Sequence, residues 1–271
     1  MKAMDWFGGE VSAEQAERLA ALYDLDNPHG PSEATDWFRA IARRTGGPIL
    51  ELGVGTGRVA IPLAQDGHEI VGLDRSPAML ARAERHARRE GVEVRLVEGD
   101  MRSFSFSEAF ALIAIPFNTF LMLTPDDRWA CLARVREHLA PTGLLAIDCF
   151  QPDPEHIVGR DGGVREEWTR HDAESGRDVT KFSSSRANVD QVDLRWWFEE
   201  LGEDGRVARW QRATTLHYLY RREAELLFVA AGFELEALHG DYDGSPAGSS
   251  SPKLLVVARR RERGAGRERR R

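Results

Sequence analysis

The sequence contains little cysteine and no long apolar run. Two cysteines, Cys131 and Cys149, among 271 residues are too few for a disulfide framework or a cysteine-rich metal site. No stretch approaches the roughly 18 to 20 apolar residues that a membrane-spanning helix needs. The N-terminal stretch is acidic and amphipathic, unlike a signal peptide. We therefore expect a cytoplasmic protein that has no membrane partner.

Net positive charge is also missing from most of the chain. The net charge is -7, and because residues 259–271 hold eight Arg and two Glu (net +6), residues 1–258 carry -13. An acidic body disfavours a nucleic-acid partner, and only the arginine-rich end offers phosphate contacts. The eight histidines include no pair at metal-ligand spacing, so we expect no metal. Residues 259–271 are predicted to be a disordered tail.

The first 150 residues have the pattern of alternating strands and helices. Helices are predicted at residues 12–23 and 32–44, on capping and amphipathic signals. Five strands then alternate with helices, which predicts a parallel, doubly wound α/β sheet. The expected strands are 49–52, 69–73, 92–97, 110–115 and 143–150, and the expected helices between them are 59–65, 76–90 and 124–139.

The alternation stops after residue 150. Residues 151–220 contain turn signals at 174–176 and 202–205, which predict antiparallel hairpins. A helix at 221–231 and strands at 233–238 and 254–258 are expected to complete the sheet. The predicted fold is therefore a Rossmann-like doubly wound seven-stranded sheet with an antiparallel β insertion after the fifth strand.

A glycine-rich turn follows the first of these strands. The run Glu51-Leu-Gly53-Val-Gly55-Thr-Gly57 lies between a strand and a helix, where open α/β sheets bind nucleotide-like ligands. Glycine allows positive φ and close approach of the backbone to a ligand. Asp74, at the end of the second strand, is placed to accept the hydroxyl protons of a ribose. Asp100, after the third strand, is placed to meet an exocyclic amine.

The two aspartates also bear on the kind of ligand. They disfavour the pyrophosphate of a dinucleotide and tolerate a ligand with a positive centre. The dinucleotide fingerprint also requires a glycine where this sequence has Arg58. An NAD-dependent oxidoreductase is therefore the weaker alternative.

Four segments together resemble the motifs of class I S-adenosylmethionine-dependent methyltransferases, in the family's order. They are residues 50–58, 72–80, 98–101 and 115–119. The resemblance implies that Glu51 and the backbone of 53–57 hold the methionine part of S-adenosylmethionine, and that Asp74 binds the ribose. It implies further cofactor contacts from the second, third and fourth motifs: Arg75, Met79, Asp100, Met101 and Pro116, with both methionines on the adenine faces and Asp100 at its amine.

Outside residues 49–150 the resemblance is looser and is to sugar-amine and glycine-type methyltransferases. It implies five segments: a helical lid (1–45), a cofactor-binding core (46–150), a substrate cap (151–220), the end of the core sheet (221–258) and the tail. Tyr23 is placed where such lids reach the cofactor. Asn118 follows the fourth strand, where the family places acceptor contacts.

Methyl transfer is an in-line displacement in which the cofactor supplies the reactive carbon, so no acid-base pair is obligatory. His217 and Tyr242 are the candidate catalytic residues that could tune an acceptor. Tyr218 and Tyr220 alternate with His217 along one strand, so the three cannot share one pocket wall. These two tyrosines and Trp196 are candidate substrate-binding residues.

The resulting hypothesis is a methyltransferase that acts on a small molecule, with the insertion as its substrate cap. Besides the oxidoreductase, a non-catalytic cofactor-binding module and a nucleic-acid methyltransferase are the alternatives. Exposed apolar insertions often pair subunits, so we also expect a homodimer. The acceptor atom, nitrogen, oxygen or carbon, is left open by the sequence.

Overall fold

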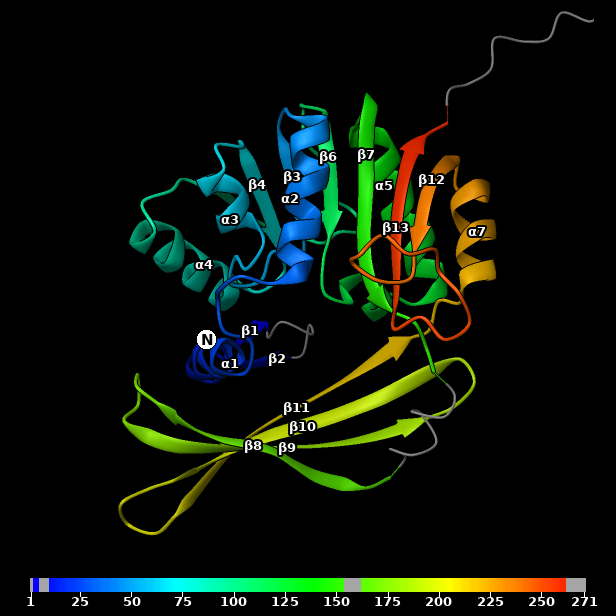
Figure 1. Ribbon diagram of the computed structural model, residues 1–271. Coiled ribbons are helices and arrows are strands. Elements are labelled where there is room, and N and C mark those ends of the chain that lie inside the picture. The colour runs from blue at the N-terminus through cyan, green and yellow to red at the C-terminus, as the bar shows by residue number, and fades with distance from the viewer. Residues whose placement is uncertain (1, 5–9, 154–161, 262–271) are drawn as a thin grey trace, which may run out of the picture.

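The computed structural model describes residues 2–4, 10–153 and 162–261, and its core is one mixed β-sheet (Figure 1). The strand order in this sheet is β12-β13-β7-β6-β3-β4-β5. The five strands β3 to β7 pair in parallel, and β13 is antiparallel to both of its neighbours, so that β12 runs in the same direction as those five. The strands are β3 (Ile49–Leu52), β4 (Ile70–Asp74), β5 (Arg95–Glu98), β6 (Phe110–Ile115), β7 (Leu139–Phe150), β12 (Phe233–His239) and β13 (Lys253–Arg260).

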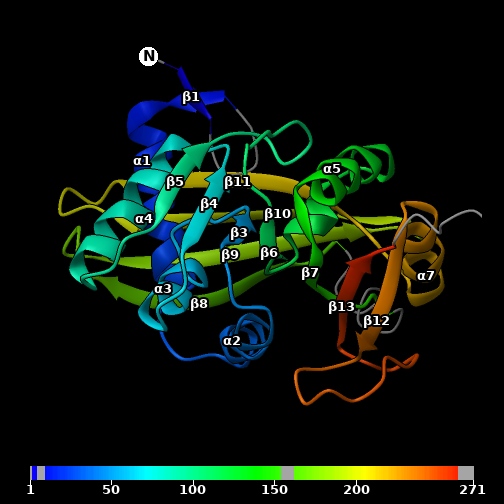
Figure 2. The ribbon, with the colours of Figure 1, turned by 90° about the horizontal axis from the view of Figure 1, so that it is seen from above.

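Helices cover both faces of this sheet (Figure 2). On one face, α2 (Glu33–Thr45) and α3 (Ala60–Gln65) pack against it, with Phe38 and Leu63 fully buried. On the other face lie α5 (Pro125–His138) and α7 (Arg221–Ala230), which bury Leu132 and Phe228. The predicted Rossmann-like, doubly wound seven-stranded sheet is confirmed.

Local signals in the sequence account for the positions where the helices begin. Ser12 caps α1 (Ala13–Asp26) in a capping box with Gln15. Ser76 caps α4 (Pro77–Arg89), and Thr124 caps α5, each followed by a proline at the first helical position. A side-chain oxygen at the cap satisfies a free N–H of the first turn, and proline there gives up no hydrogen bond.

The predicted antiparallel insertion is a separate four-stranded sheet, here called the cap sheet, in the order β11-β10-β9-β8. Gly176 and Gly205, in the two predicted turns, have φ of 70° and 76°, which glycine adopts without strain. The sheet lies across the carboxyl ends of the parallel core strands (Figure 1). Its strands are β8 (Val164–Asp172), β9 (Arg177–Ala187), β10 (Gln191–Leu201) and β11 (Val207–His217).

The structure corrects three details of the sequence analysis. Strand β7 begins at Leu139 rather than at 143, because a register shift against β6 accommodates the turn-forming residues 140–143. A small hairpin of β1 (Lys2–Met4) and β2 (Glu10–Ser12) precedes α1 and was not expected. Strand β13 continues to Arg260, two residues into the predicted tail, and residues 262–271 lie outside the described ranges.

Helix α1 joins the cap sheet to the core. Leu22 is fully buried against Val179 and Phe198 of the cap sheet, and the helix also packs along α4. Arg18 forms ion pairs with Asp172 (2.8 Å) and Glu200 (2.7 Å) of the cap sheet. Within the described ranges, every helix is too short or too polar to span a bilayer.

A substitution of Arg128 tests how much the contact between the cap sheet and the core contributes to stability. Its buried guanidinium donates from α5 to the carbonyl of His217 and, at 3.0 Å, to that of Tyr218. Replacement by Ala leaves two inward-facing carbonyls without donors, so Arg128→Ala is expected to lower the free energy of unfolding by roughly 2–4 kcal/mol. Urea denaturation measures this loss.

The matched control is Arg134→Ala. Arg134 lies on the same helix, and within the described part of the chain its side chain pairs with Glu137, three residues away. Such surface pairs contribute about 0–1 kcal/mol, so this variant should unfold close to the wild type. Equal losses in both variants would contradict a specific role for Arg128.

Candidate active site

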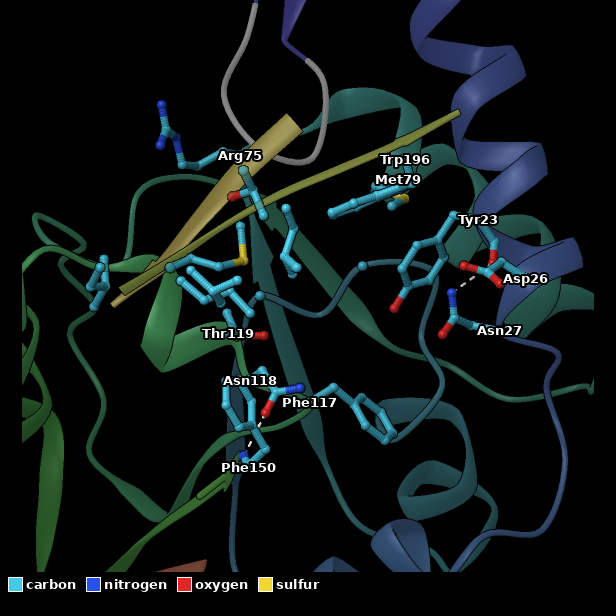
Figure 3. Close-up of a pocket in the computed structure, with 18 of the residues that line it drawn as sticks. Tyr23, Asp26, Asn27, Arg75, Met79, Phe117, Asn118, Thr119, Phe150 and Trp196 are labelled. Atoms are coloured by element: carbon cyan, nitrogen blue, oxygen red, sulfur yellow. Dashed lines mark hydrogen bonds between the residues drawn. The ribbon is translucent and has the colours of Figure 1, made fainter. Parts of the chain in front are cut away.

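A cavity of about 770 Å³ lies between the core strand ends, α1 and the cap sheet. Figure 3 shows residues from these three parts of the chain around one space. Twelve residues that the sequence analysis assigned to the site line it: Tyr23, Glu51, Gly53, Gly55, Asp74, Arg75, Met79, Asp100, Met101, Asn118, Trp196 and Tyr218. The fold therefore brings together most of the predicted cofactor site and part of the predicted acceptor site.

The glycine-rich turn is held by Asp74. One carboxylate oxygen of Asp74 accepts from the N–H of Gly55 and the other from the N–H of Ser76, both at 2.9 Å. Gly53 has φ of 74°, and a Cβ there would lie 2.5 Å from the Thr119 side chain. The turn therefore requires glycine at this position, for conformation and for space.

Glu51 is a buried acid at the end of β3. It is 2% exposed, and its Oε2 has no hydrogen-bond partner among the described residues. Burial raises the pKa of Glu51 well above its ordinary value. Glu51 lines the cavity, and a buried carboxylate with a free oxygen is suited to an ammonium group.

Asp100 is already engaged by an arginine that the sequence analysis did not consider. Its two oxygens accept from Arg102 Nε at 2.9 Å and Nη2 at 2.6 Å, and Arg75 Nε lies 3.6 Å away. Burial alone would raise the pKa of Asp100, but the two arginines outweigh it and the pKa lies below its ordinary value. Asp100 is therefore an ionised acceptor at neutral pH. Met79, which is buried, and Met101 line the cavity nearby.

Arg58 is a second residue that the sequence analysis missed. It appeared there at the end of the first motif and as the residue that breaks a dinucleotide fingerprint, but without a role in the site, yet it lines the cavity. Its guanidinium lies 4.0 Å from the ring centre of Phe117. Burial raises the pKa of Tyr23, and the neighbouring Arg58 opposes this effect. Arg58 is thus a fixed positive charge beside Tyr23, suited to a carboxylate.

Phe117 and Asn118 adopt strained backbone conformations after β6. Their φ values are 53° and 66°, in the left-handed region that residues other than glycine seldom occupy. Two bonds hold Asn118: its N–H donates to the Asp148 carbonyl at 2.9 Å, and its Oδ1 accepts from the N–H of Phe150 at 2.7 Å (Figure 3). Because Oδ1 is occupied, the Asn118 side chain offers the cavity its N–H donors.

Cap-sheet residues form the opposite wall of the cavity. Trp196 of β10 lies across from Ser183 of β9 in the strand register, and both line the cavity. Tyr218, just after β11, is buried, and its hydroxyl has no hydrogen-bond partner among the described residues. Burial raises the pKa of Tyr218 to about 12, so it remains a neutral donor and acceptor at neutral pH.

Three residues expected at the acceptor site do not line the cavity. His217 lies on the opposite side of its strand from Leu216 and Tyr218, as alternation requires. Tyr220 is 40% exposed and donates to the Val189 carbonyl. Tyr242 folds back on the core and donates to the buried Asp148 at 2.8 Å. Their positions do not support the predicted catalytic and substrate-binding roles.

Two expected cofactor residues also lie outside the lining. Gly57 has φ of 90°, and a Cβ there would lie 2.8 Å from Ile61 of α3. Glycine at this position therefore allows α3 to pack closely against the turn. The Pro116 carbonyl accepts from the Thr119 hydroxyl at 2.6 Å, which shapes the turn after β6.

The residues present fit S-adenosylmethionine group by group. Glu51 has a free buried oxygen for the ammonium, and Arg58 offers a positive charge for the carboxylate. Asp74 suits the ribose hydroxyls, and Met79 and Met101 supply apolar surface for the adenine. The bare backbone at Gly53 leaves room for close approach. This fold and these side chains suit a methyltransferase that uses S-adenosylmethionine.

Comparisons with known proteins agree with a methyltransferase function. Residues 49–143 match the methyltransferase domain family. The cypemycin N-terminal methyltransferase of a Streptomyces species is 28% identical over 225 residues, which cover 83% of this chain and 87% of that protein. A dTDP-3-amino-3,4,6-trideoxy-alpha-D-glucopyranose N,N-dimethyltransferase of Streptomyces venezuelae is 27% identical, over 79% of this chain and 87% of its own length.

Solved structures are similar over almost the whole chain. The CcbJ methyltransferase from Streptomyces caelestis is 25% identical with a TM-score of 0.72, over 92% of this chain and 98% of that one. CalS10 from Micromonospora echinaspora is an amino pentose methyltransferase solved with S-adenosylmethionine. It is 26% identical with a TM-score of 0.66, over 88% of this chain and 96% of that one. The present chain is an S-adenosylmethionine-dependent methyltransferase. These relatives favour this cofactor over NAD.

Glu51 is expected to bind the cofactor directly. Glu51→Gln removes the negative charge with little change of shape, and a hydrogen bond to a charged group contributes roughly 1.5–3 kcal/mol. The affinity for S-adenosylmethionine in calorimetry should therefore fall about 10- to 100-fold. Glu98→Gln, at the exposed end of β5, is the control, and an equal loss there would contradict the assignment.

In the absence of cofactor, Glu51→Gln is expected to raise the free energy of unfolding, by an amount that depends on pH. Because the folded-state pKa of Glu51 is raised by burial above its ordinary 4.5, the wild type loses stability as pH rises from that value towards the folded-state pKa. Gln does not titrate. The unfolding free energy of Glu51→Gln should therefore increasingly exceed that of the wild type as pH rises through this window, as followed by urea denaturation. A constant difference at all pH values would rule this out.

Proposed function

We propose that this enzyme transfers the methyl group of S-adenosylmethionine to an amine nitrogen of a small natural-product intermediate, with an amino sugar as the leading class. The relatives support a nitrogen acceptor, since the names of two include an amino-sugar N,N-dimethyltransferase and an N-terminal methyltransferase. The structurally similar CalS10 is an amino pentose methyltransferase.

The observation that carries the proposal is the chemistry of the cavity lining. Among the described residues, the lining includes no histidine and no cysteine. Its aspartates away from the cofactor groups, Asp26 and Asp127, are paired with Lys181 at 2.6 Å and Arg102 at 3.1 Å. A free amine carries its own lone pair and needs no side chain to remove a proton before attack. A hydroxyl acceptor would need such a base.

The cofactor supplies an activated methyl group to an in-line nucleophile. The chain binds the cofactor through Glu51 and Asp74, excludes water by closing the cavity with α1 and the cap sheet, and orients the acceptor. Asn118 donates to the acceptor from the core side. Tyr218 donates or accepts from the cap side, where its hydroxyl lacks a partner among the described residues.

Turnover with matched acceptors tests the proposal. The enzyme is incubated with S-adenosylmethionine and either a nucleotide-linked amino sugar, a peptide with a free N-terminus, or the same sugar with a hydroxyl in place of the amine. We expect S-adenosylhomocysteine and a methylated product with an amine and none with the hydroxyl analogue. Methylation of the hydroxyl analogue alone would overturn the choice of nitrogen.

Two tyrosines provide a matched pair for the acceptor site. Tyr218→Phe removes the buried hydroxyl in the cavity, and its loss should raise the KM for the acceptor about tenfold, which corresponds to one hydrogen bond. Its affinity for S-adenosylmethionine should change little. Tyr220→Phe removes an exposed hydroxyl outside the cavity and should leave both constants near the wild-type values. The reverse pattern would place the acceptor elsewhere.

The expected homodimer and cytoplasmic location remain predictions. One candidate for a subunit contact is the outer face of the cap sheet, where Phe182 stacks on Trp197 with ring centres 5.5 Å apart. Sedimentation velocity of the purified protein gives the oligomeric state.

A further inference from the structure

Three side chains that commonly bind metals meet beside the cofactor cavity. They are Asp24 near the end of α1, His29 in the connection to α2, and His86 on α4. One potential ligand atom from each lies within 4.8 Å of the other two. The imidazole rings of His29 and His86 meet edge to face, with centroids 4.3 Å apart. No part of the methyl-transfer site described above uses this cluster.

The tautomer of His86 follows from its hydrogen bond. Its Nδ1 lies 3.2 Å from the carbonyl oxygen of Thr56. A carbonyl only accepts, so Nδ1 carries a proton and donates it. In the neutral ring, Nε2 is then an acceptor with a free lone pair. This Nε2 faces Asp24 Oδ2 at 3.3 Å. Two acceptors at that distance repel each other unless a positive species lies between them.

The other oxygen of Asp24 is also available. Asp24 Oδ1 is buried and has no hydrogen-bond partner among the described residues, and His29 Nε2 lies 3.7 Å from it. The Thr56 hydroxyl lies 3.2 Å from the same His29 nitrogen. The cluster therefore presents one carboxylate oxygen and two imidazole nitrogens to a shared space.

The nearby arginine does not cancel the negative charge of this cluster. Arg82 Nε contacts Asp24 Oδ2 at 2.6 Å, and its two terminal nitrogens contact the Glu174 carboxylate at 3.0 and 3.3 Å. Arg82 is thus shared between two acids, and the formal charge of Arg82, Asp24 and Glu174 together is -1. With neutral imidazoles this negative charge favours a cation.

We propose that Asp24, His29 and His86 bind a divalent first-row transition metal ion such as Zn²⁺. Two imidazoles and one carboxylate are a donor set that such ions use, with water in the remaining positions. Ligands about 2.0–2.1 Å from a tetrahedral zinc are about 3.4 Å apart. The three ligand atoms lie within 4.8 Å of one another, so each pair needs to close by no more than about 1.4 Å. The His86 bond to Thr56 is the outer-shell contact that metal-binding histidines usually make.

The location indicates a structural role for the ion. Asp24 follows Tyr23, which lines the cavity, and Thr56 belongs to the glycine-rich turn. An ion on these ligands would fasten α1 and the following loop to α4, and His86 would connect it to the turn through its hydrogen bond to Thr56. The site is independent of the proposed methyl acceptor, so metal binding and methyl transfer can be tested separately.

Metal titration of the full chain, without an affinity tag, tests the proposal. Calorimetry with Zn²⁺ should show one ion per chain, and the visible spectrum of the Co²⁺ form should report nitrogen and oxygen ligands. His29→Ala and His86→Ala should each weaken Zn²⁺ binding at least about 100-fold, since loss of an outer-shell partner alone costs about 10- to 100-fold.

His171→Ala is the matched control. His171 is exposed on β8 and lies 3.0 Å from Asp178, away from the cluster, so this variant should bind Zn²⁺ like the wild type. If a cluster variant does not fold, the Co²⁺ spectrum of the wild type still reports the ligands. The absence of stoichiometric binding by the wild type, or an equal loss in the control, would overturn the proposal. A doubly protonated His86 ring in NMR together with no metal binding would show that a proton alone fills the site.

Discussion

The carboxylate of Asp74 is the contact on which the cofactor site depends. It accepts one hydrogen bond from the glycine-rich turn after β3 and one from the backbone that begins α4. Both N–H groups lie where two parallel strands end, and without an acceptor there they would be left unsatisfied. The turn can then pass close to Thr119 because Gly53 has no side chain. A single acid thus fixes the shape of the cradle and lines it.

Two acids are buried in the site, and the energetic penalty of their negative charges is reduced by a positively charged ligand. Burial raises the pKa of both Glu51 and Asp74, which means that their surroundings in the protein disfavour the charged forms. A ligand with an ammonium group and a sulfonium centre offsets this penalty. Perturbed acids of this kind are common at functional sites. Here the two acids lie on the core side of the cavity, and Trp196 and Tyr218 line its cap side.

Closure of the cavity depends on contacts between segments that are far apart in the sequence. Asp26 at the end of α1 accepts from Trp168 of the cap sheet and pairs with Lys181 of the next strand. Arg82 of α4 reaches both Asp24 and Glu174. These contacts hold the cap sheet in a fixed position relative to the core. In the proposed function, the core supplies the cofactor contacts, and the acceptor lies between the core and the cap sheet.

The sequence predicted the parallel core, the antiparallel insertion, the helix starts and four residues that line the cavity: Gly53, Gly55, Asp74 and Asp100. These features depend on short-range patterns: strand alternation, capping residues and the need for glycine at positive φ. Only the tertiary structure decided which loops face the cavity. It placed Arg58 inside, turned His217, Tyr220 and Tyr242 away, and brought His29 beside His86. The reason is physical: local pattern fixes the backbone within an element, but the neighbours of a loop side chain are set by packing between elements that the chain connects only at a distance.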